Sequence, residues 1–259
     1  MRDLKVVHKI TIACISIGTV VYLMGCTSAT AEINTPSTQT LIAHVPSAMS
    51  TITLDLNSYA FPRSIDPKKP HLFYLHGKII EDQGIPAISP EYGAYEYAEI
   101  LEAFRGYGFT VISEQRPKYT DGRVYASKTA EQVRVLLNAG VAPQDITVVG
   151  ASKGAGIAVM VSNSLKNEHV NYVIMGICHP EAVADFMDAG IYLSGNVLSI
   201  YDASDNYAGS CQELFISSSE KGLSSHDEIL LNIGTGHGIL YKALDEWLVP
   251  AIHWANNVP

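Results

Sequence analysis

From about residue 50 onward the chain alternates short apolar runs with segments of helical periodicity, and this alternation limits the fold more than any other feature. Most runs are apolar at nearly every position, as in strands buried on both faces of a parallel sheet. Strands are predicted at residues 51–56, 71–75, 109–112, 145–149, 172–177, 197–201 and 229–233. Helices are predicted at residues 91–104, 125–137, 157–165, 180–187 and 240–252. The pattern predicts an α/β fold with a mostly parallel sheet and helices on both faces.

Composition excludes several other classes of protein. The 259 residues are 47% hydrophobic and 17% charged, with four cysteines. An average soluble domain is about 25% charged, so the chain is too apolar to be disordered, and it has too few cysteines for a disulfide-dense miniprotein. Residues 1–25 hold three of the 17 basic and one of the 26 acidic residues, so the remainder has a net charge of −11. Such a surface repels phosphate backbones, and we expect no nucleic-acid partner.

The first 25 residues have the pattern of an export signal. Basic residues between positions 2 and 9 precede an apolar run at 10–25, whose 16 residues are short of the roughly 20 that a membrane-spanning helix needs. The run ends in Leu-Met-Gly-Cys at 23–26, which resembles the lipobox of bacterial lipoproteins. The resemblance implies cleavage before Cys26 and acylation of its sulfur. An uncleaved anchor helix and an ordinary secretory peptide are the alternatives.

The residues after Cys26 predict how the protein is presented. Residues 26–48 are rich in Ser, Thr, Ala and Pro and are predicted to form a flexible tether. Residues 49–259 are predicted to form a single domain. Thr27, rather than an aspartate, follows the lipid-bearing cysteine, which by the usual sorting rule for lipoproteins implies the outer membrane. We therefore expect an exported protein, anchored by lipid in the bacterial cell envelope on the periplasmic side.

Two cysteines remain for the folded domain, because Cys14 leaves with the signal and Cys26 takes the lipid. An even number of remaining cysteines in an exported protein predicts a disulfide, here between Cys178 and Cys211. Both residues follow predicted strands, so neighbouring strand ends make the bridge geometrically reasonable. Two unpaired, buried thiols are the alternative.

The strongest chemical signal is the sequence Gly-Ala-Ser-Lys-Gly at 150–154, between a predicted strand and a predicted helix. Gly150-x-Ser152-x-Gly154 has the form of a nucleophile elbow, a sharp strand-to-helix turn that exposes a serine hydroxyl. The turn strains the serine backbone, so the positions two residues either side must lack bulk. The motif also resembles the dinucleotide fingerprint of short-chain dehydrogenases. That interpretation is disfavoured, because it expects the motif on the first strand and a downstream Tyr-x-x-x-Lys, which is missing after residue 156.

A serine nucleophile needs a base and an orienting acid. The predicted strand 229–233 is followed by a glycine-rich loop that holds His237, the candidate base. The predicted strand 197–201 is followed by two candidate acids, Asp202 and Asp205. Asp205, one short turn beyond the strand, is favoured, while Asp202 at the strand end is the alternative that would cap the loop.

Two backbone amides complete the predicted site. The amide of Lys153, directly after the serine, and an amide at Lys78 or Ile79, after the His76-Gly77 dipeptide, would form an oxyanion hole. We expect the Lys153 side chain to point to solvent. His76 is predicted to be structural, and the other histidines at 71, 169, 179 and 226 lack metal-ligand spacing, so no metal site is predicted.

His76-Gly77, the Ser152 elbow, Asp205 and His237 occur in the order found in α/β-hydrolases, and the chain resembles that superfamily over about residues 50–255. The resemblance implies an eight-stranded sheet, a Ser152-His237-Asp205 triad that forms an acyl-enzyme, and no cofactor. Only 19 residues at 178–196 could form a lid, so we expect an open site, a small-molecule ester substrate and no large lid. The alternative is a catalytically inactive member that binds a ligand or partner in the envelope.

Overall fold

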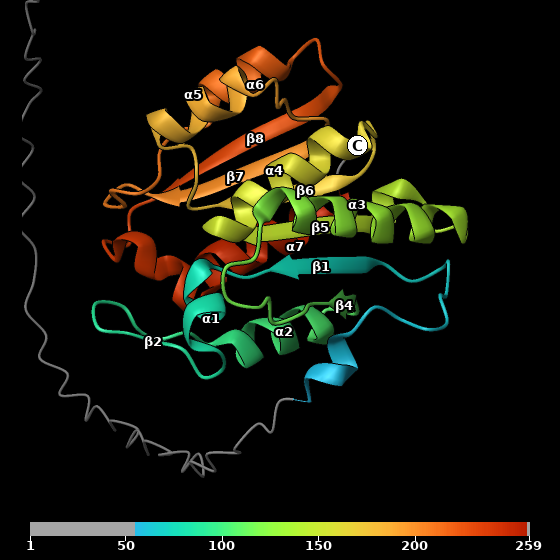
Figure 1. Ribbon diagram of the computed structural model, residues 1–259, viewed down its shortest axis with the longest axis horizontal. Helices are drawn as coiled ribbons and strands as arrows, with labels where there is room; N and C mark the ends of the chain where they lie inside the picture. The colour runs from blue at the N-terminus through green and yellow to red at the C-terminus, as the bar shows by residue number, and fades with distance from the viewer. Residues whose placement is uncertain (1–54, 258–259) are drawn as a thin grey trace, which may run out of the picture. The chain divides into compact units, whose positions relative to one another are not determined.

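A parallel six-stranded sheet forms the centre of the domain, which a computed structural model describes for residues 55–257. The predicted signal peptide, Cys26 and the tether at 26–48 lie outside the described residues. The strand order is β4-β1-β5-β6-β7-β8, and every neighbouring pair is parallel (Figure 1). The strands are β1 (His71–Leu75), β4 (Thr110–Ile112), β5 (Ile146–Ala151), β6 (Asn171–Met175), β7 (Gly195–Asp202) and β8 (Leu223–Leu231).

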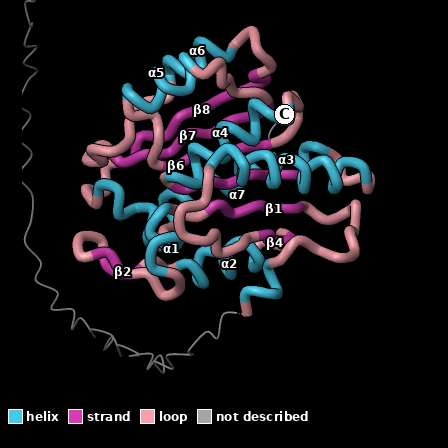
Figure 2. The backbone as a smooth tube through the Cα atoms, viewed as in Figure 1, coloured by secondary structure: helices cyan, strands magenta, loops and turns pink. Residues whose placement is uncertain are grey.

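The expectation of an eight-stranded sheet is wrong for the described residues. Two further strands, β2 (Ile88–Ser89) and β3 (Gly93–Ala94), pair only with each other, as an antiparallel hairpin beside the sheet (Figure 2). The strand predicted at 51–56 lies mostly outside the described residues, and its end, Leu56, begins the 3-10 helix η1 (Leu56–Tyr59). The side chain of Asp55 accepts a hydrogen bond from the amide of Asn57, which favours a turn over an extended strand.

Helices cover both faces of the sheet, as predicted (Figure 1). α1 (Lys78–Gln83), α2 (Tyr97–Gly106) and α7 (Asp245–Asn257) pack on one face, and α3 (Gly122–Asn138), α4 (Lys153–Leu165), α5 (Pro180–Asp188) and α6 (Gln212–Ser218) on the other. Two 3-10 helices, η2 (Pro143–Asp145) and η3 (Gly236–Tyr241), complete the described elements. None of the helices in residues 55–257 is long and apolar enough to span a bilayer.

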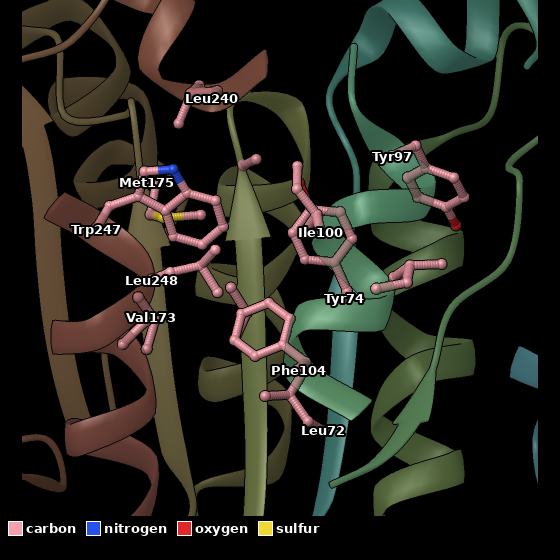
Figure 3. Close-up of a cluster of buried hydrophobic side chains, with 14 of the residues drawn as sticks. Leu72, Tyr74, Tyr97, Ile100, Phe104, Val173, Met175, Leu240, Trp247 and Leu248 are labelled. Atoms are coloured by element: carbon pink, nitrogen blue, oxygen red, sulfur yellow. The ribbon is translucent and has the colours of Figure 1, made fainter. Parts of the chain in front are cut away.

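Strands β1, β5 and β6 are apolar at nearly every position because both of their faces are buried, whereas the edge strand β8 is partly exposed and carries polar residues. In β1, Leu72 and Tyr74 enter the cluster under α2 and α7, whereas Phe73 and Leu75 enter the cluster under α3 and α4. Figure 3 shows the first cluster, in which Trp247 packs against strand side chains. Burial of a large apolar side chain contributes about 1.5–3 kcal/mol to the stability of the fold relative to leaving it exposed. The two clusters therefore hold the helices against the sheet.

Several predicted boundaries differ from the structure, among them those of the segments predicted at 91–104, 229–233 and 240–252. The helix predicted at 91–104 begins only at Tyr97, because residues 88–94 form the hairpin, in which Gly93 has a φ of +78°. The strand predicted at 229–233 instead runs from Leu223 to Leu231. Beyond its end, the carboxylate of Asp202 accepts hydrogen bonds from the amides of Ile233 and Gly234. The helix predicted at 240–252 is divided into η3 and α7, since Lys242 is extended between them.

Candidate active site

The turn at Ser152 has the geometry that its sequence predicts. Ser152 lies between β5 and α4 with a φ of +52°, a strained value for a residue with a side chain. A Cβ on Gly150 would lie 2.4 Å from the carbonyl oxygen of Gly154, and one on Gly154 would lie 1.8 Å from that of Leu75. Both glycines are therefore required by close backbone packing. The Ser152 side chain makes no capping bond to α4, so its hydroxyl is left for other partners.

The carboxyl ends of the parallel strands bring the predicted residues to one edge of the sheet. Ser152 follows β5, Asp205 follows β7 and His237 follows β8. The turn after β1 also lies close to Ser152, since a Cβ on Gly77 would be 3.8 Å from the Cβ of Ser152. A pocket of about 90 Å³ opens here. It is lined by Gly77, Lys78, Ile79, Tyr95, Ser152, His237, Leu240 and Tyr241.

His237 is held by the carboxylate of Asp205. The Nδ1 atom of His237 lies 2.7 Å from Oδ2 of Asp205, whose side chain is fully buried. The other oxygen of Asp205 accepts a hydrogen bond of 2.8 Å from the amide of Tyr207. A carboxylate on Nδ1 places the proton there and leaves Nε2 free to accept one.

Asp202 has a different task from Asp205. Its carboxylate accepts hydrogen bonds from the amides of Ile233 (2.8 Å) and Gly234 (3.2 Å) and from the amide and hydroxyl of Ser204. Burial alone would raise the pKa of Asp202, but these hydrogen bonds outweigh it and lower the pKa below its usual value. Asp202 therefore ties the start of the His237 loop to the end of β7, the loop-capping role that the sequence left as its alternative.

Both predicted oxyanion donors stand at the first turn of a helix. Lys153 is the first residue of α4, and Lys78 is the first residue of α1. Amides in the first turn have no partner within the helix and lie at the positive end of its dipole. Gly77 and Ser152, the residues before them, both line the pocket. This arrangement can stabilise a negative oxygen formed beside Ser152.

The Lys153 side chain does not point to solvent, so that expectation is wrong. Its Nζ atom lies 2.5 Å from Oε2 of Glu81 and 2.7 Å from the carbonyl oxygen of Thr120. Glu81 also accepts a 2.6 Å bond at Oε1 from Nε of Arg116, and both side chains are buried. Paired, hydrogen-bonded charges of this kind can be buried, whereas a lone one is costly.

Arg116 connects these charges to the loop that carries Gly77. Its guanidinium donates to the carbonyl oxygen of His76, and its amide donates to Nε2 of His76 at 2.9 Å. Nδ1 of His76 lies 2.8 Å from the carbonyl oxygen of Gly77. Burial first, and the charge of Arg116 second, lower the pKa of His76 to about 3, so this ring is neutral and structural, consistent with its predicted role.

Sequence reasoning missed the pair formed by Glu81 and Arg116. The two residues are 35 positions apart, and each lies in a segment that reads as ordinary surface. No local pattern marks them. The pair becomes evident only when α1 packs against the segment after β4. Glu81 then contacts both Arg116 and Lys153, the residue whose amide is a proposed oxyanion donor.

The predicted disulfide is confirmed. Cys178 and Cys211 are bonded, with their Cα atoms 5.2 Å apart. Cys178 forms a β-bridge with Ala208, and the amide of Gly209 donates to the carbonyl oxygen of Ile177. The cross-link therefore fastens the loop that begins at Asp205 to the end of β6.

No group of three His, Cys, Asp or Glu side chains within residues 55–257 is arranged to hold a metal ion. Neither a protein-family model nor a curated protein sequence matches the chain.

Several solved structures are similar in fold. An esterase/lipase from an uncultured bacterium is 10% identical, with a TM-score of 0.49 over 73% of this chain and 76% of that one. A thioesterase, RedJ, from the prodiginine pathway of Streptomyces coelicolor is 14% identical, with a TM-score of 0.46 over 76% and 92%. SOBER1 of Arabidopsis thaliana is 10% identical, with a TM-score of 0.48 over 72% and 97%.

Proposed function

We propose that this chain is a serine hydrolase of the α/β-hydrolase superfamily that cleaves carboxylic esters. The observation that carries the proposal is the Asp205–His237 hydrogen bond at a pocket that Ser152 also lines, with Ser152 on a strained strand-to-helix turn. A strained backbone costs about 1–3 kcal/mol and persists where the surrounding structure requires it, often at functional sites. A protein that only binds a ligand has no need for this combination.

Each residue has a defined task in the proposed reaction. The hydroxyl oxygen of Ser152 attacks the ester carbonyl carbon while Nε2 of His237 takes its proton. The amides of Lys78 and Lys153 stabilise the tetrahedral oxyanion. The bond from carbon to the alcohol oxygen then breaks, and His237 gives its proton to that oxygen. Water, deprotonated by Nε2 of His237, then attacks the acyl carbon. The bond from that carbon to the Ser152 oxygen breaks, and His237 returns the proton to this oxygen, which releases the carboxylic acid and restores Ser152.

Pocket size supports a short acyl group. The pocket beside Ser152 measures about 90 Å³, well below the roughly 300–1,000 Å³ of typical small-molecule sites. Its apolar walls come from Ile79, Leu240 and Tyr241. The connection between β6 and β7 contains one helix, α5, of nine residues. These features favour an acyl chain of a few carbons over a long lipid tail.

Labelling with a fluorophosphonate probe tests the proposal. Such probes react with activated serines, so the wild-type protein should be labelled and Ser152→Ala should not. Asp205→Asn should lower kcat for a short ester by orders of magnitude, because it removes the carboxylate that sets the His237 tautomer. An absence of labelling in well-folded wild-type protein would instead favour the inactive, ligand-binding alternative.

We propose further that the hydrolase is a lipoprotein of the bacterial envelope, anchored through Cys26 on the periplasmic side of the outer membrane. The Leu-Met-Gly-Cys motif at 23–26 and the tether-like composition of 26–48 support this location. Two or more acyl chains hold a protein stably on a bilayer, whereas one does not. Mass spectrometry of the membrane-extracted protein should find Cys26 as an acylated N-terminus, and an unmodified Cys26 in the mature protein would refute the anchor.

A further inference from the structure

We propose that the ester substrates carry a polyhydroxylated alcohol, such as a sugar, and that this alcohol binds in a second pocket beside His237. This inference rests on the proposed function. The second pocket has a volume of about 290 Å³, roughly three times that of the pocket beside Ser152. Its side chains are Glu91, Tyr92, Ser204, Asn206, Tyr207 and His237, with Thr235 at the loop. His237 is shared by both pockets.

The reaction assigns the two parts of an ester to the two pockets. The acyl carbon must lie against the hydroxyl of Ser152, with its carbonyl oxygen toward the proposed amide donors of Lys78 and Lys153. Ser152 and Lys78 both line the small pocket. The alcohol oxygen must face His237, because His237 gives it a proton when the bond breaks. The rest of the alcohol can then occupy the larger pocket, which His237 also lines.

The lining of the larger pocket suits a neutral group rich in hydroxyls. Glu91 accepts hydrogen bonds, whereas Asn206 and Thr235 both donate and accept them. All the lining residues lie in the described part of the chain, and none is Lys or Arg. A phosphorylated alcohol would meet the carboxylate of Glu91 with no cation to offset it. An apolar alcohol would bury these polar groups without partners, which is also unfavourable.

Two aromatic rings add a surface for a sugar ring. The rings of Tyr92 and Tyr207 lie beside the His237 ring, one tilted and one edge-on, with centroid distances of 6.5 and 5.5 Å. Tyr207 is 65% exposed although it is large and aromatic. The face of an aromatic ring is electron-rich, so it attracts the weakly positive C–H groups that one side of a sugar ring presents.

Hydrogen bonds from backbone amides hold the segments that line this pocket. The hydroxyl of Ser89 accepts hydrogen bonds from the amides of Glu91 and Tyr92, which holds the hairpin that carries them. The amide of Tyr207 donates to Asp205, the same carboxylate that holds His237. A preformed site loses less conformational entropy on binding than a mobile one.

Hydrolysis of two acetate esters by the full-length protein tests the proposal. We expect kcat/KM for 6-O-acetylglucose to exceed that for butyl acetate by at least about tenfold, since an alcohol that pairs the polar groups gains roughly 1.4 kcal/mol or more. Tyr207→Ala should lower the ratio of the two values by about tenfold, chiefly through KM for the sugar ester, because binding contacts are lost. The control is Tyr107→Ala, since Tyr107 is also exposed but follows α2, away from both pockets. This variant should keep the ratio.

The outcomes separate this inference from the proposed function. If Ser152-dependent hydrolysis of butyl acetate equals or exceeds that of the sugar ester, and Tyr207→Ala leaves the ratio unchanged, the polyhydroxylated alcohol is wrong while the serine hydrolase stands. If neither ester is hydrolysed and no fluorophosphonate label appears, the proposed function fails and this inference falls with it.

Discussion

At the scale of single residues, His76 shows how the environment sets a charge state. Its ring is buried, it faces the guanidinium of Arg116, and its two nitrogens contact the amide of Arg116 and the carbonyl oxygen of Gly77. Burial first, and the charge of Arg116 second, lower the pKa of His76 from 6.5 to about 3, although the hydrogen bond to Gly77 acts in the opposite direction. Because the neutral ring is the form that fits, protonation of His76 opposes the folded state.

The stability of the protein should therefore fall in mild acid. Above pH 6.5 His76 is neutral in both states, whereas between pH 6.5 and 3 the unfolded chain binds a proton that the folded one does not. The free energy of unfolding should drop with falling pH across this window, by about 3 kcal/mol at pH 4 from His76 alone. Urea titrations of wild type and His76→Gln from pH 7.5 to 4 would measure this drop.

The variant His76→Gln should start less stable at pH 7.5 but lose less stability on acidification. His169→Gln is the control, since His169 is exposed, and it should retain the wild-type slope. His71 is also buried with a lowered pKa, so it contributes a slope of the same sign in all three proteins. Equal slopes in His76→Gln and wild type would contradict the assignment.

At the scale of elements, Glu81 connects three separate segments. It lies in α1, pairs with Lys153 at the start of α4, and pairs with Arg116 in the segment after β4. The helices α1 and α4 begin with the two proposed oxyanion donors, Lys78 and Lys153. The position of the Lys78 amide relative to the Lys153 amide therefore depends on the buried carboxylate of Glu81.

Loss of the Glu81 charge should be strongly destabilising. Glu81→Gln leaves the buried guanidinium of Arg116 without an anionic partner, which costs about 3–5 kcal/mol. The neighbouring variant Asp82→Asn breaks only the exposed pair with Lys78, and it should cost less than about 1 kcal/mol. Urea unfolding of both variants measures the difference. Similar costs for the two would show that the buried pair has no special role.

The turn between β5 and α4 agrees with the sequence prediction, although α4 begins at Lys153, four residues before its predicted start at 157. The strand β5 and the helix α4 meet at Ser152, and the glycines two positions before and after it mark the turn in the sequence. The segment 91–96 is predicted as helix together with 97–104, although the residues at helical spacing begin only at Tyr97. The structure instead folds residues 88–94 into a hairpin that contributes Tyr92 to the site.

At the scale of the molecule, one covalent bond fastens the edge where the site is built. The disulfide Cys178–Cys211 spans 33 residues and closes the chain around α5 and β7. It acts chiefly by restricting the unfolded chain, and a loop of this length corresponds to about 3–4 kcal/mol in the loop-entropy model. The Asp205 loop lies within this closed segment, so the bond also limits its movement.

Removal of the disulfide should lower stability and loosen the site. The double variant Cys178→Ser/Cys211→Ser should unfold at a lower urea concentration, with a loss of about 2–5 kcal/mol. A peptide digest of wild-type protein without reductant should contain Cys178 and Cys211 in one cross-linked fragment. Separate, unlinked peptides would show that the bond does not form in the protein as made.

The sequence alone determined the parallel α/β sheet, the turn at Ser152 and the candidate residues at the strand ends. These depend on local periodicity and local sterics, and parallel strands deliver their carboxyl ends to one edge. Only the tertiary structure decided which aspartate holds His237, because Asp202 and Asp205 differ by three positions and each could reach a neighbouring loop. It also decided the burial of Glu81 with Arg116 and the six-stranded width of the sheet. Such features depend on contacts between residues far apart in the chain, which local patterns do not encode.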